Sequence, residues 1–195
     1  MPFFKNFFRL SLAVLLALLV VGLRNASEAD TASERFSATA VQLDAPMGNV
    51  TTPVDILIDR WSTDEERDTL VNHILESTPA RLLSAVQKLP RVGSIRAAAG
   101  LGWDLRFARR TMAANGTERI TIVTDRPVAF WETQSGSRTL DYPYTVIEFR
   151  ISPNGQGEGQ MTVGTRISAD KEDRTIVLEN YGIQPVMLTN VKREK

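Results

Sequence analysis

Cysteine is the residue type that this chain of 195 residues lacks altogether. Its absence excludes disulfide bonds, a thiolate nucleophile, a thiolate metal site and a lipid-modified cysteine. A domain without disulfides has to draw its stability from packing. We therefore expect a substantial hydrophobic core, and a chain of this length is long enough to bury one.

Histidine is nearly absent as well, since His73 is the only one. A Ser-His-Asp triad would have to use it, and a zinc site would have one imidazole and no thiolate. His73 falls between Asn72 and Ile74 in a regular amphipathic helical pattern, which is typical of a surface or boundary position. We predict that His73 has no catalytic role, and we predict neither a metal nor a cofactor.

Long hydrophobic runs are confined to the N-terminus. Two basic residues precede an apolar stretch over residues 10–23, whose 14 residues fall short of the roughly 20 that span a bilayer. Ser27-Glu28-Ala29 offers small residues at the −3 and −1 positions of a cleavage site. We predict a signal peptide over residues 1–29 and one exported, periplasmic or extracellular domain over residues 30–195. The alternative is an uncleaved leader, which would be the protein's only contact with the membrane.

Neither sign of charge is in excess, because 23 basic and 23 acidic residues give a formal net charge of zero. Removal of residues 1–29 takes away three basic residues and one acidic residue, which leaves 20 basic and 22 acidic residues. A mild arginine cluster lacks interleaved exposed aromatics; it consists of Arg106, Arg109, Arg110 and Arg126. We therefore predict no nucleic-acid partner.

The hydrophobic pattern begins with two strands and two helices. Strands are expected over residues 35–43 and 54–61. Ser62 and Glu65 predict a capping box at the start of a helix that ends near Ser77. A second helix is predicted to begin at Pro79, where the fixed φ of proline suits the first helical position, and to end at the next proline.

After Pro90 the chain alternates between apolar and polar residues in short segments. Hairpin-length turns, such as Asn115-Gly116, separate these segments and favour an antiparallel meander of about six strands. We therefore expect an α+β fold, with a twisted antiparallel β-sheet, open or barrel-like, and two short helices packed on one face or end. The buried helical face should pack against strand residues such as Ile147 and Phe149; it consists of Leu70, Ile74, Leu82 and Val86.

Carboxylates on strands or strand ends are candidates for an acid/base pair; they are Asp104, Asp125, Glu132, Asp141 and Glu148. The alternation places Asp104 and Glu148 opposite the apolar side, which favours solvated positions. Asp125-Arg126-Pro127 is interpreted as a strand end with a local ion pair. These carboxylates keep a hydrolase open as an alternative function.

Two turns resemble ligand-binding motifs only in part. The turn over residues 153–159 holds three glycines, but it lacks the Gly-Lys-Ser/Thr ending of a phosphate loop and no helix follows it. The acidic turn over residues 170–173 lacks the glycine and the distal glutamate of a calcium loop. We interpret both as ordinary turns.

Tryptophan and tyrosine supply the candidate ligand-binding residues. Trp103 shares an alternating pattern with Leu105 and Phe107, which predicts a core position. Trp131 alternates away from its apolar neighbour and is expected to be exposed. The residues assigned to a sugar or lipid cleft are Trp131, Tyr142 and Tyr144.

Three segments carry a resemblance to known proteins. Residues 141–148, 157–159 and 181–188 resemble exported bacterial β-rich proteins that have no assigned function. These segments lie in the C-terminal half, and they are turn and strand patterns rather than catalytic signatures. The resemblance implies a bacterial, exported β-rich domain and transfers no activity.

The sequence thus favours a non-catalytic exported module that binds a small apolar ligand or a cell-envelope protein. A cell-envelope hydrolase using strand-borne carboxylates is the first alternative. A structural or assembly protein is the second. An enclosed apolar space between helices and sheet would favour the ligand-binding function.

Overall fold

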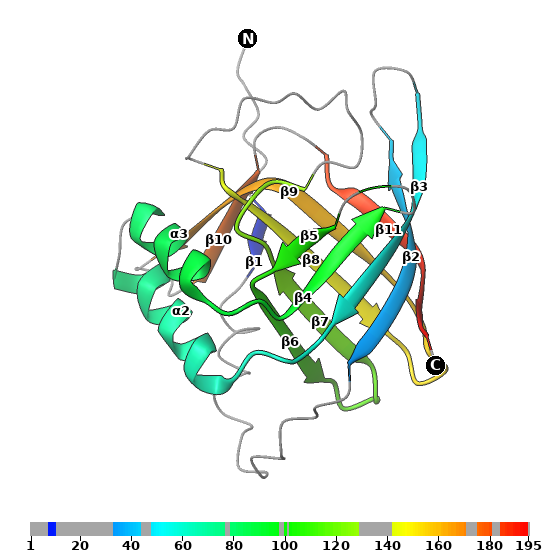
Figure 1. The fold of residues 1–195 in the computed structure, drawn as a ribbon, viewed down its shortest axis with the longest axis horizontal. Coiled ribbons are helices and arrows are strands. Elements are labelled where there is room, and N and C mark those ends of the chain that lie inside the picture. Colours follow the sequence, from blue (N-terminus) through cyan, green and yellow to red (C-terminus); the bar gives the residue numbers. More distant parts are fainter. Residues whose placement is uncertain are drawn as a thin grey trace.

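The protein is described by a computed structural model that is mostly antiparallel β-sheet with two short helices, which confirms the predicted α+β class (Figure 1). The structure describes residues 8–10, 33–43, 48–76, 79–97, 100, 102–128, 142–170, 175–180 and 184–194. Within these residues all strands belong to one sheet of 11 strands.

Two strands and two helices precede the meander as predicted, with the short β1 before them, and the described meander has eight strands, β4 to β11, rather than about six. They are β1 (Phe8–Leu10), β2 (Glu34–Gln42), β3 (Val50–Ile58), α2 (Asp64–Glu76), α3 (Pro79–Lys88), β4 (Gly93–Ala97), β5 (Trp103–Leu105), β6 (Phe107–Met112), β7 (Glu118–Val123), β8 (Tyr144–Ile151), β9 (Gln156–Asp170), β10 (Thr175–Asn180) and β11 (Val186–Arg193). Of the predicted signal peptide, only β1 is described, and it pairs with β10.

The sheet curls into a nearly closed barrel. Its strand order is β5-β4-β3-β2-β11-β9-β8-β7-β6, so β5 and β6 stand at opposite ends of the path. Only Arg106 separates these two strands in the chain. One continuous stretch therefore pairs with β4 through its first half and with β7 through its second half. If β5 and β6 are counted as one strand, the nine strands of the path form a ring of eight.

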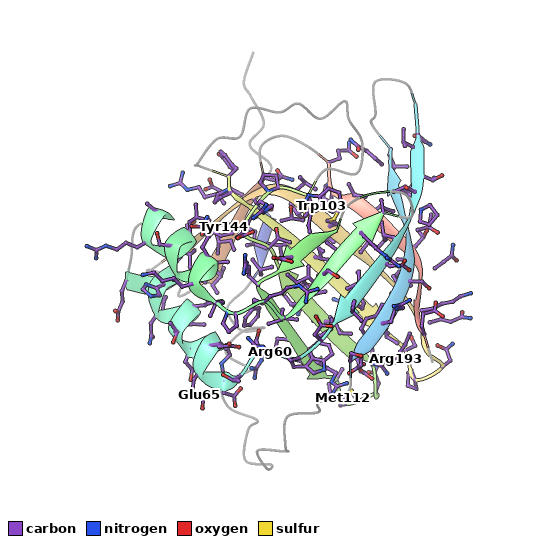
Figure 2. All side chains as sticks on the ribbon, viewed as in Figure 1. Arg60, Glu65, Trp103, Met112, Tyr144 and Arg193 are labelled. Carbon is purple, nitrogen blue, oxygen red and sulfur yellow. The ribbon has the colours of Figure 1, made fainter. Side chains whose placement is uncertain are left out.

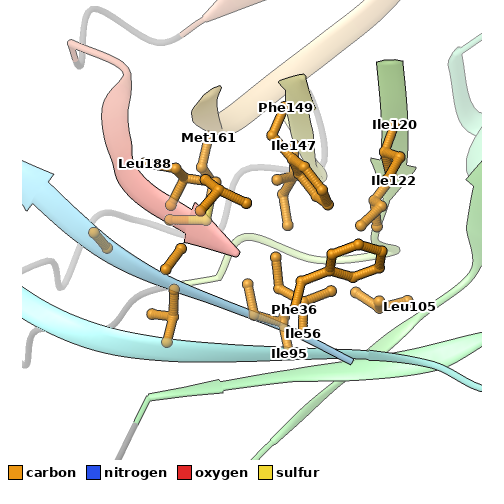
Figure 3. Close-up of a cluster of buried hydrophobic side chains, with 14 of the residues drawn as sticks. Phe36, Ile56, Ile95, Leu105, Ile120, Ile122, Ile147, Phe149, Met161 and Leu188 are labelled. Atoms are coloured by element: carbon orange, nitrogen blue, oxygen red, sulfur yellow. The ribbon is translucent and has the colours of Figure 1, made fainter. Parts of the chain in front are cut away.

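Large apolar side chains fill the interior of the barrel (Figure 3). They alternate along each strand with residues that face outward, as the period of two requires. The fully buried ones include Phe36, Ile56, Ile120 and Phe149. The rings of Phe36 and Phe149 meet edge to face, with centroids 5.2 Å apart. An eight-stranded ring is just wide enough for its own side chains to fill.

The two helices pack on the outside of the barrel and form a second core. Leu70, Leu82 and Val86 are buried there, as predicted, and Ile74 is partly buried. The predicted contact with Ile147 and Phe149 is wrong, because both residues point into the barrel. The helices instead cover the opposite face of the same strands, which presents Phe107, Val123, Tyr144, Val146 and Ile167.

The stretch from Trp103 to Phe107 changes face at Arg106, which sequence alternation did not predict. Leu105 belongs to the barrel interior, whereas Phe107 belongs to the helix-side core. Trp103 is half-buried and packs against the barrel interior. The change of face lies where the chain passes from pairing with β4 to pairing with β7.

The start of α2 lies one residue later than predicted. The capping box joins Thr63 and Glu66: the Thr63 amide donates to Glu66 Oε2 at 3.0 Å, and the Glu66 amide donates to Thr63 Oγ1 at 3.2 Å. Ser62, the predicted cap, is buried and bonds to β6 instead. Ser62 and Thr63 both have a hydroxyl that can cap a helix. The hydrogen bond between Ser62 and β6 leaves Thr63 as the capping residue.

Two strand boundaries also differ from the prediction. β3 begins at Val50, because Pro53 is accommodated within the strand. Pro53 pairs with Thr39 of β2, and the described pairing of β4 with β3 begins at Val54, next to Pro53. Gly157 and Gly159, predicted as turn residues, lie in β9. A Cβ on Gly157 would lie 1.8 Å from the carbonyl oxygen of Arg150, so the close approach of β8 requires glycine.

Membrane-spanning helices are absent from the described part of the chain, where neither helix has the length and apolar character needed to cross a bilayer.

Candidate functional site

The layer between the helices and the sheet is the most distinctive region of the described chain. Its floor is formed by apolar side chains of β6, β7, β8 and β9, chiefly Phe107, Val123, Val146 and Ile167. Its roof is the buried face of α2 and α3. A rim of apolar side chains that are only partly buried surrounds both; it consists of Ile74, Leu83, Ala85, Leu89, Ile176 and Leu178. This layer is therefore apolar and less completely covered than the barrel interior.

Tyr144 is the polar exception in this apolar layer. It begins β8 beside the helical pair (Figure 2). Its side chain is 1% exposed, and its hydroxyl has no hydrogen-bond partner among the described residues. Desolvation raises the pKa of the Tyr144 hydroxyl well above its usual range, so the group stays neutral and keeps its proton.

An unpaired buried hydroxyl is costly. Leaving such a group without a partner typically costs about 1–3 kcal/mol, because the water lost on folding is not replaced. Buried polar groups without partners are uncommon in folded proteins and call for a reason. The Tyr144 hydroxyl is thus a buried hydrogen-bond donor, unpaired among the described residues, inside an apolar layer.

Arg109 lies on the same outer face of the sheet, two residues after Phe107. Its Nη1 atom donates to Asp64 Oδ1 at the start of α2, with a distance of 2.8 Å. The Arg109 hydrogen bond, opposed by partial burial, holds the pKa of Asp64 below its usual value. The Arg109 side chain is 21% exposed, and its Nε atom is buried without a hydrogen-bond partner in the described part of the chain. The layer therefore holds a second unused donor.

The helical pair is anchored at its base. Arg60 forms a bidentate ion pair with Glu66 at 2.8 and 3.0 Å, which is the main reason that the pKa of Glu66 lies below its usual value. At the other end of the pair, Arg106 Nη1 donates to the Leu89 carbonyl oxygen at 3.5 Å. These contacts fix both ends of the helical pair, where the chain leaves β3 and returns to β4.

The three predicted ligand-binding residues have different fates. Tyr144 lies in the layer described above, on the outside of the barrel. Tyr142 is partly buried just before β8. Trp131 lies outside the described residues, so its predicted exposure stays a prediction. Of the three, Tyr144 is the one whose hydroxyl is buried without a hydrogen-bond partner among the described residues.

Arginines contact every candidate carboxylate that the structure describes. Arg106 lies between Asp125, at 3.2 Å from Nε to Oδ2, and Asp104, at 3.7 Å from Nη2 to Oδ2. The predicted local ion pair between Asp125 and Arg126 is confirmed, at 3.1 Å. Glu148 pairs with Arg119 at 2.6 Å. Glu132 and Asp141 lie outside the described residues.

The predicted arginine cluster is dispersed into separate ion pairs. Arg106 and Arg126 share Asp125, Arg109 contacts Asp64, and Arg110 contacts Glu34 at 2.9 Å. Arg109 was singled out in the sequence only as part of that cluster. The signal that could have identified its role is its spacing from Phe107, since residues two apart on a strand share a face.

His73 lies on α2 and is partly buried. Among the described residues, no group of three or more histidine, aspartate or glutamate side chains is placed to hold a metal ion.

A second polar network lies at the end of the barrel where β11 ends. Arg193 contacts Glu34 at 3.1 Å and forms a bidentate pair with Glu118 at 2.5 and 3.0 Å. The guanidinium of Arg110 lies over the ring of Trp61, 4.9 Å from its centroid. The Trp61 indole donates to Glu34 at 3.1 Å. The charges balance within the network, which therefore ties strand ends together and leaves no net charge for a ligand.

The chain matches no protein-family model, no curated protein and no solved structure.

Proposed function

We propose that this protein binds a small apolar ligand between the α2–α3 pair and the outer face of the sheet. One hydrogen-bond acceptor of the ligand would lie on the Tyr144 hydroxyl. The observation that carries this proposal is the burial of that hydroxyl, without a partner, in an otherwise apolar layer. A ligand acceptor would remove the cost of the unpaired group, and that gain would add to affinity.

The chemistry of the layer selects the ligand. Phe107, Val123 and Val146 offer only apolar surface, so the body of the ligand would be bound through the area that it removes from water. The neutral Tyr144 hydroxyl would donate to a carbonyl, ester or hydroxyl oxygen. The partly covered rim, which includes Leu83 and Leu89, would be the route of entry, since it leads from solvent into the layer.

Dodecanol tests this function, because it combines an apolar chain with one oxygen acceptor. The full-length protein should bind it, as measured by displacement of an apolar fluorescent dye. Tyr144→Phe should weaken dodecanol binding by about tenfold, which corresponds to about 1.4 kcal/mol. The same substitution should leave the free energy of unfolding unchanged or raise it, because it removes an unpaired buried hydroxyl.

Tyr142→Phe is the matched control, two residues earlier in the same segment. It should leave dodecanol affinity within about twofold of the wild type, a change worth only about 0.4 kcal/mol. Absence of dodecanol binding, or equal effects of the two substitutions, would contradict the proposed function.

We also propose that the protein acts outside the cytoplasm, as a periplasmic or extracellular binding module. The leader pattern over residues 1–29 supports this proposal. Protein recovered from the cell envelope or medium should begin near Asp30 when its N-terminus is sequenced. A product that keeps Met1 and stays in the cytosol would contradict export without touching the ligand proposal.

A further inference from the structure

The two unused donors of the helix-side layer stand at opposite ends of its apolar floor. Along β8, Tyr144 precedes Glu148 by four residues, roughly 13 Å at the usual rise of a strand. Glu148 pairs with Thr121, and Thr121 pairs with Arg109, which adds two strand spacings of roughly 10 Å in total. The Cα atoms of Tyr144 and Arg109 are therefore separated by roughly 16 Å across the face of the sheet.

Apolar side chains occupy the diagonal between these two residues. Phe107 precedes Arg109 by two residues on the same face of β6. Phe107 pairs with Val123, and Val123 pairs with Val146, which follows Tyr144 on β8. All of these except Arg109 belong to the helix-side core. Across this face of the sheet, the neutral donor Tyr144 is followed by the apolar side chains and then by the cationic donor Arg109.

The present partner of Arg109 is a weak one. Asp64 is 67% exposed, and an ion pair with such an exposed carboxylate contributes little net free energy. The Arg109 side chain is much less exposed, and its Nε–H has no partner among the residues that the structure describes. A carboxylate that approached from within the layer would meet both Nε and an Nη atom, the bidentate geometry that arginine favours.

We propose that the ligand is an amphiphile with a carboxylate at one end and a neutral oxygen acceptor at the other, joined by an apolar chain. The carboxylate binds Arg109, the chain lies over Phe107, Val123 and Val146, and the distal oxygen accepts from Tyr144. This inference rests on the proposed function and adds the chemical class of the ligand.

The test compares ω-hydroxydodecanoate with dodecanol on the full-length protein. The two compounds share the chain and an oxygen for Tyr144, and they differ in the carboxylate. Wild-type protein should bind ω-hydroxydodecanoate about tenfold more tightly than dodecanol. Arg109→Gln should remove that advantage and leave dodecanol affinity unchanged. Arg96→Gln, on β4, removes an exposed ion pair with Asp55 on β3 and should change neither affinity.

Asp64→Asn supplies an independent arm, because it removes the competing carboxylate and keeps Arg109. It should raise the affinity for ω-hydroxydodecanoate about threefold, leaving dodecanol affinity as in wild type. Equal binding of the two compounds by wild-type protein, or an advantage that survives Arg109→Gln, would overturn the carboxylate assignment while the proposed function stands. If neither compound binds, the proposed function itself fails, and the assignment fails with it.

Discussion

Ser62 and Ala108 are joined by a pair of hydrogen bonds that ties the start of the helical pair to β6. The Ser62 amide donates to the Ala108 carbonyl oxygen at 2.8 Å, and the Ala108 amide donates to Ser62 Oγ at 3.1 Å. Both residues are buried. The Ser62 hydroxyl thus accepts a hydrogen bond from a β6 amide, as a carbonyl oxygen of a neighbouring strand would. Ser62 lies where the chain turns from β3 toward α2.

Removal of that hydroxyl should destabilise the protein. Ser62→Ala leaves the Ala108 amide buried without a partner, which should lower the free energy of unfolding by about 1–3 kcal/mol in urea denaturation. Ser84→Ala, at an exposed position of α3, is the control and should change it by less than about 0.5 kcal/mol. Equal effects would show that the hydrogen bond contributes nothing.

The packing of α3 can be measured at Leu82. This side chain is buried in the helix-side core, so Leu82→Ala should lower the free energy of unfolding by about 2–5 kcal/mol. Leu83 lies next to it but is only partly buried, and Leu83→Ala should cost less, because fewer contacts are lost. A reversed order of the two effects would mean that α3 presents a different face to the sheet.

Arg193 should stabilise the end of the barrel. Arg193→Met removes one of the two arginines that contact Glu34 and Glu118, both mostly buried, and leaves them only Arg110. We expect the free energy of unfolding to fall by about 1–3 kcal/mol, below the usual cost for a fully buried pair because the site is partly solvated. Arg96→Met breaks an exposed pair and should cost less than about 1 kcal/mol. Thermal and urea unfolding would measure both variants, and equal losses of stability would contradict the stabilising role of Arg193.

Stability should depend on pH through Glu66. Its folded-state pKa is lowered, chiefly by the hydrogen bonds from Arg60. A lowered pKa gives a contribution that is full above the unfolded-state pKa and is lost as the pH falls through the folded-state value. The protein should therefore lose stability below about pH 4.

Glu66→Gln isolates that contribution. The variant should be less stable than wild type at pH 7, and the difference should shrink as the pH falls below about 4. Glu65→Gln removes a neighbouring exposed carboxylate and should leave the pH profile close to that of wild type. If the difference in the free energy of unfolding between wild type and Glu66→Gln is the same at about pH 3 as at about pH 7, Glu66 is not the source of the pH dependence.

Local sequence patterns predicted most helices and strands, because hydrophobic periodicity, helix caps and turn residues are all local in the sequence. The alternation at Ile147 and Phe149 correctly indicated one buried face, and Leu82 and Val86 indicated the buried side of α3. The error lay in pairing these two surfaces. β8 is buried on both faces, and a period of two cannot tell which face meets the helices and which meets the barrel interior.

The candidate site was less predictable than the fold. Tyr144 was identified as a ligand-binding residue from its aromatic character alone. Its decisive property, a buried hydroxyl without a partner, depends on what every neighbouring element contributes. The contact of Arg109 could not be predicted, since its partner Asp64 is 45 residues away in sequence. Such long-range pairing has no local signature.

The start of β2 and the end of β11 lie side by side in the barrel, which has a consequence for how the strands can be connected. β2 and β11 are neighbours in the ring, and the Glu194 amide donates to the Arg35 carbonyl oxygen at 2.9 Å. The closing seam lies elsewhere, within the single stretch that forms β5 and β6. A short linker from Glu194 to the start of β2 would therefore permit circular permutation, with new termini at the exposed Asn115-Gly116 turn. Every strand pair of the ring would be retained in the rearranged chain.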